Sequence, residues 1–266
     1  MKALILCGGQ GTRLRRLTET QPKPMVRVGG RPILWHIMKT YAHAGVTDFV
    51  LCLGYKGDMI KDYFLNYQAR NCDFTLTLGA SAEVEVYREG KEDGWRVTLT
   101  ATGETAMTGA RIRRAARYLD PDEPFCITYA DGVIDLDLRE TFAFHRSHQG
   151  LVTMTGVRPP SRFGELVHEG GRVLSFNEKP QVAGGLINGG YFVADPGFLE
   201  YLTEDDDCIL EREPLERCAA DGQLYTFEHD GYWHCMDTYR DFKHLNEVWA
   251  AGNAPWCVWD RPERDR

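Results

Sequence analysis

Glycines and basic residues gather within the first 25 positions of the chain, in a pattern suited to binding phosphate. Gly8, Gly9 and Gly11 follow a short apolar run, and Arg13 comes two residues after the last of them. Glycine lets the main chain approach a ligand closely, and a series of N–H groups turned toward it binds anions. Lys23 lies between two prolines, which restrict the backbone on both sides of it. We therefore expect this glycine loop, Arg13 and Lys23 to bind phosphate groups.

The loop departs from two common phosphate-binding motifs. The dinucleotide-binding fingerprint needs a third glycine three residues after Gly11, where Leu14 stands instead. The P-loop needs a lysine and a hydroxyl residue after its last glycine, whereas this loop continues with Thr12 and Arg13. Both a hydride-transferring dehydrogenase and a P-loop kinase are therefore disfavoured.

The elements that must position these residues alternate along the chain. Apolar runs predict strands at 3–6, 48–53, 125–129, 151–157 and 191–194, and helical spacing of apolar residues predicts helices at 32–43 and 56–67. This alternation predicts an α/β fold, Rossmann-like, with a mixed, mostly parallel sheet flanked by helices. Ligands in such folds bind beyond the carboxyl ends of the strands. The glycine loop and Asp131 both follow a predicted strand, so we expect them at that edge.

The domain organisation predicted is a single domain over residues 1–266 with two embellishments. The stretch 71–103 is polar and alternating, which favours an antiparallel insertion at the edge of the sheet. Residues 197–266 are interpreted as a C-terminal extension with a strand at 224–227 and a helix at 242–249.

Composition restricts the class of protein. The net charge of −8 argues against a general nucleic-acid binder, which needs an excess of Lys and Arg. We find no signal peptide and no apolar run that would span a membrane. The eight cysteines form no CxxC pair, which favours reduced thiols in the cytoplasm. His145 and His148 have no matching ligand nearby, so we interpret them as solvated residues of a helix.

Eleven short stretches occur in one order along nearly the whole chain: 8–14, 22–25, 29–38, 54–57, 107–109, 129–133, 162–164, 176–180, 187–190, 236–238 and 254–256. Together they resemble the signature of the sugar-1-phosphate nucleotidyltransferases, and most closely that of the glucose-1-phosphate cytidylyltransferase branch. The resemblance implies the nucleotidyltransferase fold. It also implies transfer of a cytidylyl group from CTP to a sugar 1-phosphate, with α-D-glucose 1-phosphate the first candidate. The products would be a CDP-sugar and pyrophosphate.

The resemblance also implies roles for individual residues, with Mg²⁺ as the cofactor. Catalysis falls to Arg13, Lys23 and Asp131, and Mg²⁺ binding to Asp131 and Asp237. Local sequence alone leaves Asp131 equally compatible with a simple Asp-Gly turn. Nucleotide binding falls to Leu6, Cys7, Gly8, Gly9, Gln10, Gly11, Thr12, Arg13, Lys23, Ala106, Thr108, Gly109, Arg111 and Ala130. Sugar-phosphate binding falls to Glu178, Lys179, Asn188 and Gly189.

Three positions depart from the family pattern and leave alternatives open. Cys7 and Ala130 replace smaller residues, and Ala106 stands where some relatives have a hydroxyl. A second reading keeps the chemistry but uses another NTP or another sugar 1-phosphate, such as a heptose phosphate. A third is a non-catalytic regulatory subunit that binds nucleotide sugars. The resemblance further implies a homo-oligomer that serves polysaccharide or O-antigen biosynthesis.

Overall fold

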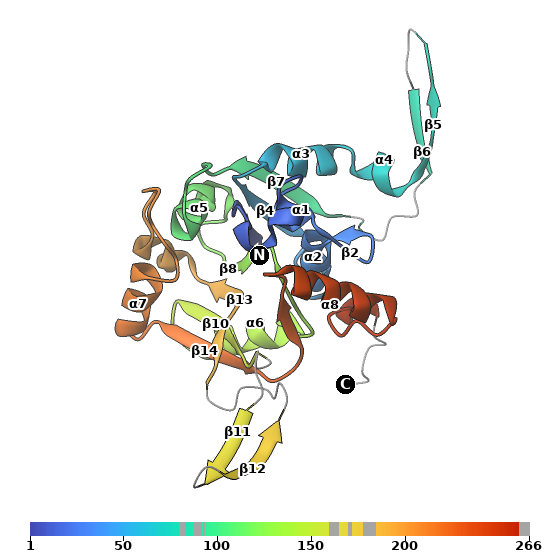
Figure 1. The fold of residues 1–266 in the computed structure, drawn as a ribbon. Coiled ribbons are helices and arrows are strands. Elements are labelled where there is room, and N and C mark those ends of the chain that lie inside the picture. Colours follow the sequence, from blue (N-terminus) through green and yellow to red (C-terminus); the bar gives the residue numbers. More distant parts are fainter. Residues whose placement is uncertain are drawn as a thin grey trace.

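A computed structural model describes residues 1–79, 83–87, 92, 94–159, 165–169, 172–177 and 185–260. Its centre is a seven-stranded sheet with strand order β14-β10-β13-β8-β1-β4-β7 (Figure 1). The strands of this sheet are β1 (Ala3–Cys7), β4 (Asp48–Leu53), β7 (Arg96–Ala101), β8 (Phe125–Tyr129), β10 (Val152–Val157), β13 (Ile187–Ala194) and β14 (Leu224–His229). β13 runs antiparallel to both of its neighbours, and the other adjacent pairs are parallel. The prediction of a mixed, mostly parallel α/β sheet is confirmed.

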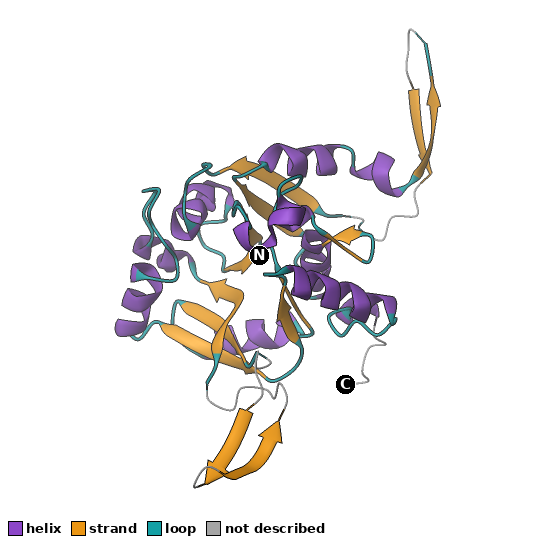
Figure 2. Cartoon of the chain, in the orientation of Figure 1, coloured by secondary structure: helices purple, strands orange, loops and turns teal. Residues whose placement is uncertain are grey.

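Helices surround the sheet, and two hairpins project from the body of the molecule (Figure 2). The helices are α1 (Arg15–Thr18), α2 (Ile33–His43), α3 (Gly57–Leu65), α4 (Tyr67–Asn71), α5 (Thr108–Ala115), α6 (Leu138–Ser147), α7 (Glu213–Ala220) and α8 (Tyr239–Ala250). The projecting hairpins are β5 (Asp73–Thr77) with β6 (Glu83–Tyr87), and β11 (Glu165–Glu169) with β12 (Arg172–Asn177). The remaining short strands are β2 (Arg27–Val28), β3 (Arg31–Pro32), β9 (Gly132–Ile134) and β15 (Trp233–Cys235).

Each face of the sheet has its own hydrophobic core. Ile5 of β1 belongs to the cluster that α2 covers, whereas its neighbours Leu4 and Leu6 belong to the cluster that α5 covers. Successive side chains of a strand point to opposite faces, so a strand covered on both faces is apolar throughout. This explains why β1 reads as an uninterrupted apolar run.

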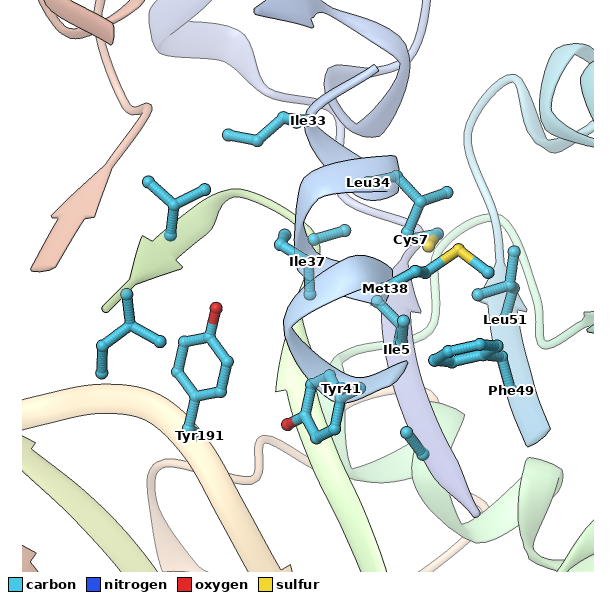
Figure 3. Packing of buried hydrophobic residues seen from close by; sticks show 14 of the residues in the cluster. Ile5, Cys7, Ile33, Leu34, Ile37, Met38, Tyr41, Phe49, Leu51 and Tyr191 are labelled. Atoms are coloured by element: carbon cyan, nitrogen blue, oxygen red, sulfur yellow. The ribbon is translucent and has the colours of Figure 1, made fainter. Parts of the chain in front are cut away.

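Helix α2 shows why its sequence folds as it does. Ile37, Met38 and Tyr41 recur at helical spacing and are at most 1% exposed. Met38 points toward β4, and the ring of Tyr41 stacks on Tyr191 of β13 (Figure 3). Burial of each such side chain contributes about 1.5–3 kcal/mol. Pro32 immediately precedes the helix, and Gly45, with φ of +87°, follows its end.

The predicted antiparallel insertion over 71–103 is wrong in its second half. β5 and β6 pair antiparallel, but β7 joins the central sheet parallel to β4. β7 lies at the edge of the sheet, where Val97 and Leu99 pack against the hydrophobic core, while the residues that alternate with them, Thr98 and Thr100, are polar although half-buried and buried. An edge strand with apolar residues on one face and polar residues on the other alternates in polarity whether it is parallel or antiparallel. At the other edge, β14 of the predicted C-terminal extension pairs parallel with β10.

The expectation about the two histidines is wrong for His145, which is 5% exposed. His145 Nδ1 and His148 Nε2 lie 2.9 and 2.7 Å from the hydroxyl of Thr153, so both rings bond to β10. The eight cysteines are free. Within the described ranges, no helix combines the length and apolar character that crossing a membrane requires.

Candidate active site

Two pairs of neighbouring strands bring distant parts of the chain together at the carboxyl ends of β1 and β8. β1 and β8 are parallel, with Leu6 opposite Tyr129, so the glycine loop and Asp131 follow adjacent strand ends. β9 pairs with β15, and the N–H of Met236 donates to the carbonyl of Asp131 at 2.8 Å. Asp237 therefore lies beside Asp131 despite their separation in sequence.

A lysine connects the two carboxylates. The Nζ atom of Lys23 lies 2.5 Å from Oδ2 of Asp131 and 2.8 Å from Oδ1 of Asp237. Burial alone would lower the pKa of Lys23, but the charge of Asp131 and hydrogen bonds to both carboxylates hold it above its ordinary value. Arg13 Nη1 lies 2.9 Å from Oδ2 of Asp237. Four residues predicted for catalysis or metal binding thus meet in one cluster.

The prolines around Lys23 act as the sequence suggested. Lys23 begins a short 3₁₀ helix, η2 (Lys23–Met25), in which Pro24 is buried. The N–H of Met25 donates to the carbonyl of Pro22 at 2.9 Å. Gly11, with φ of +60°, passes so close that a Cβ there would lie 3.2 Å from Cβ of Lys23. The glycine loop therefore packs directly on the segment that carries the lysine.

Asp237 is held in place by the start of α8. The Oδ2 atom of Asp241 accepts hydrogen bonds from the N–H groups of Asp237 and Thr238, at 3.1 and 2.7 Å, and from the hydroxyl of Thr238 at 2.8 Å. Thr238 accepts in turn from the N–H of Asp241, which completes a capping box. His234 Nε2 lies 3.2 Å from the other carboxylate oxygen of Asp241. Asp241 thus fixes the main chain of Asp237.

Arg111 lies beneath the glycine loop and is 4% exposed. Its guanidinium donates to the carbonyls of Leu53, Gly103 and Gly8 at 3.1, 2.7 and 3.3 Å, and to the hydroxyl of Thr102 at 3.0 Å. A Cβ at Gly8 would lie 2.1 Å from the Arg111 Cζ atom, so only glycine fits there. Arg111 thereby joins the carboxyl ends of β1, β4 and β7. Its predicted contact with a nucleotide stays a prediction.

The carboxylate of Glu211, which the sequence analysis did not predict, links the start of α5 to the end of β8. Glu211 accepts hydrogen bonds from the hydroxyl of Thr108, at 2.7 Å, and from the hydroxyl of Tyr129. Burial and the charge of Glu211 raise the pKa of Tyr129. Glu211 lies in a polar stretch with no motif around it, so its sequence carries no signal for this role.

The predicted sugar-phosphate residues divide into two groups. Asn188 Oδ1 accepts from the N–H of Gly190 at 2.8 Å, and the carbonyl of Gly189 accepts from the indole of Trp233 at 2.8 Å. A Cβ at Gly189 would lie 2.8 Å from Cγ1 of Val157, so β10 crowds that position. Glu178 and Lys179 lie outside the described residues.

The other predicted nucleotide-binding positions differ in exposure. Gly9, Gln10 and Thr12 are exposed at the loop, whereas Leu6, Cys7, Ala106 and Ala130 are buried beneath it or beside it. Gly109 is the second residue of α5, and a Cβ there would lie 2.6 Å from Sγ of Cys208, so that position is crowded.

The donor atoms of the cluster fit a divalent cation. Asp131, Cys235 and Asp237 each offer one ligand atom, and these atoms all lie within 4.8 Å of one another. Two carboxylates suit Mg²⁺, which is usually held by one or two of them plus substrate phosphates. Burial and the nearby Asp131 raise the pKa of the Cys235 thiol. Cys235 could not be predicted as a ligand from residue spacing, because only strand pairing places it beside Asp131.

Comparison with known proteins identifies the family of this chain. A model of the family described as "Nucleotidyl transferase" matches residues 2–247. The glucose-1-phosphate cytidylyltransferase of Salmonella typhi is 48% identical over 260 residues, which cover 98% of this chain and 100% of the relative. The mannose-1-phosphate guanyltransferase of Neurospora crassa is 32% identical over 249 residues, covering 91% of this chain and 62% of the relative. The solved structure of HddC from Yersinia pseudotuberculosis shares the fold, with a TM-score of 0.67, 24% identity and coverage of 93% and 99%. The chain therefore belongs to the nucleotidyl transferase family.

Proposed function

We propose that this protein transfers a cytidylyl group from CTP to α-D-glucose 1-phosphate, giving a CDP-sugar and pyrophosphate. A phosphate oxygen of the sugar 1-phosphate attacks the α-phosphorus of CTP in line. The bond from that phosphorus to the bridging oxygen of the β-phosphate breaks, and the electron pair leaves with pyrophosphate. Such a displacement needs positioning and charge stabilisation but no covalent enzyme intermediate.

The observation that carries the proposal is the cluster of Lys23, Arg13, Asp131 and Asp237 at the carboxyl ends of β1 and β8. Lys23 and Arg13 are cations placed beside a loop whose main-chain N–H groups suit phosphate. When triphosphate binds, its oxygens take the place of carboxylates as partners of these cations. A subunit that only bound nucleotide sugars would have no need of two acids at this point.

The cofactor proposed is Mg²⁺, held by Asp131 and Asp237. When bound, it supplies positive charge that neutralises phosphate oxygens and pyrophosphate as it leaves. In the structure the ammonium of Lys23 neutralises both carboxylates. A cation bound by Asp131 and Asp237 would take over that role, and the ammonium would then be free to bind the phosphates.

The choice of CTP and glucose is supported by the similarity to the glucose-1-phosphate cytidylyltransferase of Salmonella typhi, which is 48% identical and aligns over 98% of this chain. The Neurospora crassa relative carries a name with a different base and sugar, and it favours the second candidate, the same chemistry with another NTP or sugar 1-phosphate. We expect the protein to work in the cytoplasm, and surface polysaccharide or O-antigen synthesis is the pathway proposed.

A homo-oligomer is part of the proposal. On the β5–β6 hairpin, Phe74 and Leu76 stand opposite Val86 and Val84, and three of these side chains are 42–58% exposed. One face of a projecting hairpin is thus apolar, and a two-stranded hairpin is marginal without further packing. Light scattering measures the molar mass of the wild type and of Leu76→Glu in solution. If both proteins had the mass of a monomer, the proposed homo-oligomer would be contradicted.

The experiment that tests the function is a matrix of nucleotides and sugars. The protein is incubated with Mg²⁺, each of CTP, UTP, dTTP, GTP and ATP, and each of several sugar 1-phosphates, and pyrophosphate release is measured. We expect the fastest release with CTP and glucose 1-phosphate. Release with another pair alone would establish the second candidate. Nucleotide binding without release from any pair would favour the regulatory subunit.

A further inference from the structure

A thiol stands beside the two carboxylates of the proposed metal site. Cys235 is the last residue of β15 and is half-buried, and its Sγ lies within 4.8 Å of a carboxylate oxygen of Asp131 and of Asp237. Cys235 pairs with Gly132, the residue after Asp131. Main-chain pairing therefore holds all three ligand atoms near one another before any ion binds.

The ligand set exceeds what Mg²⁺ uses. Mg²⁺ takes oxygen ligands and gains nothing from sulfur, whereas Zn²⁺ and other cations with affinity for thiolates gain strongly. Two carboxylates and one thiolate make three protein ligands, and Zn²⁺ with three protein ligands keeps a fourth position open. Asp131 and Asp237 thus offer oxygen ligands to Mg²⁺, and together with Cys235 they offer oxygen and sulfur ligands to Zn²⁺.

The space between the carboxylates already favours positive charge. Lys23 Nζ lies at hydrogen-bond distance from both Asp131 and Asp237. The ammonium of Lys23 makes no bond to the sulfur of Cys235, so a divalent cation that binds this sulfur gains a bond that the ammonium lacks. A cation that also binds the thiol therefore has an advantage over both the ammonium and Mg²⁺.

We propose that Cys235 makes this site a binding site for Zn²⁺-like cations, which compete with Mg²⁺ and inhibit nucleotidyl transfer. Binding forms a sulfur–metal bond, releases the thiol proton to solvent and frees the Lys23 ammonium from the carboxylates. No electrons are transferred. The binding step stands on the ligand geometry alone, and its inhibitory consequence rests on the proposed function.

The direct test uses Cd²⁺ as a probe, because a cadmium–thiolate bond absorbs in the near ultraviolet. Metal-free, reduced protein is titrated with Cd²⁺ as wild type, Cys235→Ser and the control Cys72→Ser, whose thiol lies at the base of the β5–β6 hairpin. We expect wild type and Cys72→Ser to share a saturable absorption that Cys235→Ser lacks. Equal absorption in all three proteins would overturn the proposal, whether or not the protein turns over CTP.

Two further measurements complete the test, and the first of them depends neither on the folding of a variant nor on activity. In wild type alone, Cd²⁺ should slow alkylation of Cys235, measured peptide by peptide, and an unchanged rate would overturn the proposal. With Mg²⁺ and substrates present, Zn²⁺ should inhibit wild type, and the half-inhibitory concentration should rise at least about tenfold in Cys235→Ser. Inhibition that is equal in both proteins would refute the regulatory consequence. Cadmium binding without any Mg²⁺-supported turnover would refute the proposed function and leave the metal site standing.

Discussion

Replacement of Asp241 tests whether the start of α8 positions the acid of the cluster. Asp241 Oδ2 accepts three hydrogen bonds, from the N–H groups of Asp237 and Thr238 and from the hydroxyl of Thr238. At about 1 kcal/mol for each bond, Asp241→Ala should lower the free energy of unfolding by about 3 kcal/mol. Asp241→Asn keeps an oxygen acceptor at that place, so it should lose about 1 kcal/mol.

The functional readout is the dependence of pyrophosphate release on Mg²⁺ concentration. Because Asp241 holds the main chain of Asp237, the half-saturating Mg²⁺ concentration should rise about 10–100-fold in Asp241→Ala and less in Asp241→Asn. Glu247→Gln, a change on the exposed side of the same helix, should alter neither stability nor Mg²⁺ dependence. Chemical denaturation and steady-state kinetics measure the two effects. An Asp241→Ala protein that is destabilised but keeps the wild-type Mg²⁺ dependence would show that Asp241 only caps the helix.

Three further substitutions separate the roles of neighbouring residues. Lys23→Gln should lower turnover at least about 100-fold while it tightens metal binding, because the competing ammonium is gone; kinetics and calorimetry measure both, and weaker metal binding would contradict us. Glu211→Gln should raise substrate KM severalfold with little loss of stability, since Glu211 is exposed, and an unchanged KM would remove it from the site. Arg111→Met should lower the free energy of unfolding by about 3 kcal/mol, because it leaves buried carbonyls without donors, and denaturation near the wild-type midpoint would refute that role.

Much of the fold could be predicted from the sequence, because most central strands are covered on both faces and are therefore apolar throughout. The strands predicted at 48–53 and 125–129 match β4 and β8 at both ends. The edge strand β7 was misassigned, because alternation of polar and apolar residues has the same pattern in parallel and antiparallel strands. The burial of His145 was also missed, since its partner Thr153 lies on another element.

The candidate site could be predicted from the sequence only at residues that carry a local sequence signal. Glycines that follow a strand and a lysine between prolines mark the glycine loop and Lys23. Cys235 and Glu211 have no such signals, because strand pairing and a side-chain contact from a distant loop bring them to the site. Thr238 and Asp241 have the spacing of a capping box, which marks the start of a helix but does not reveal that this start lies beside Asp131. Side-chain partners of this kind depend on three-dimensional contacts that residue spacing does not encode.

Pyrophosphate release by Asp131→Asn tests the central claim most directly. The substitution preserves the size of the side chain but removes the charge that faces Lys23 and the proposed cation. Asp137→Asn is the matched control, because Asp137 caps α6 through the N–H of Arg139 at 3.0 Å. With CTP, glucose 1-phosphate and Mg²⁺, we expect Asp131→Asn to lose at least about 100-fold in turnover and Asp137→Asn to keep the wild-type rate. A folded Asp131→Asn protein with near-wild-type turnover would contradict the account.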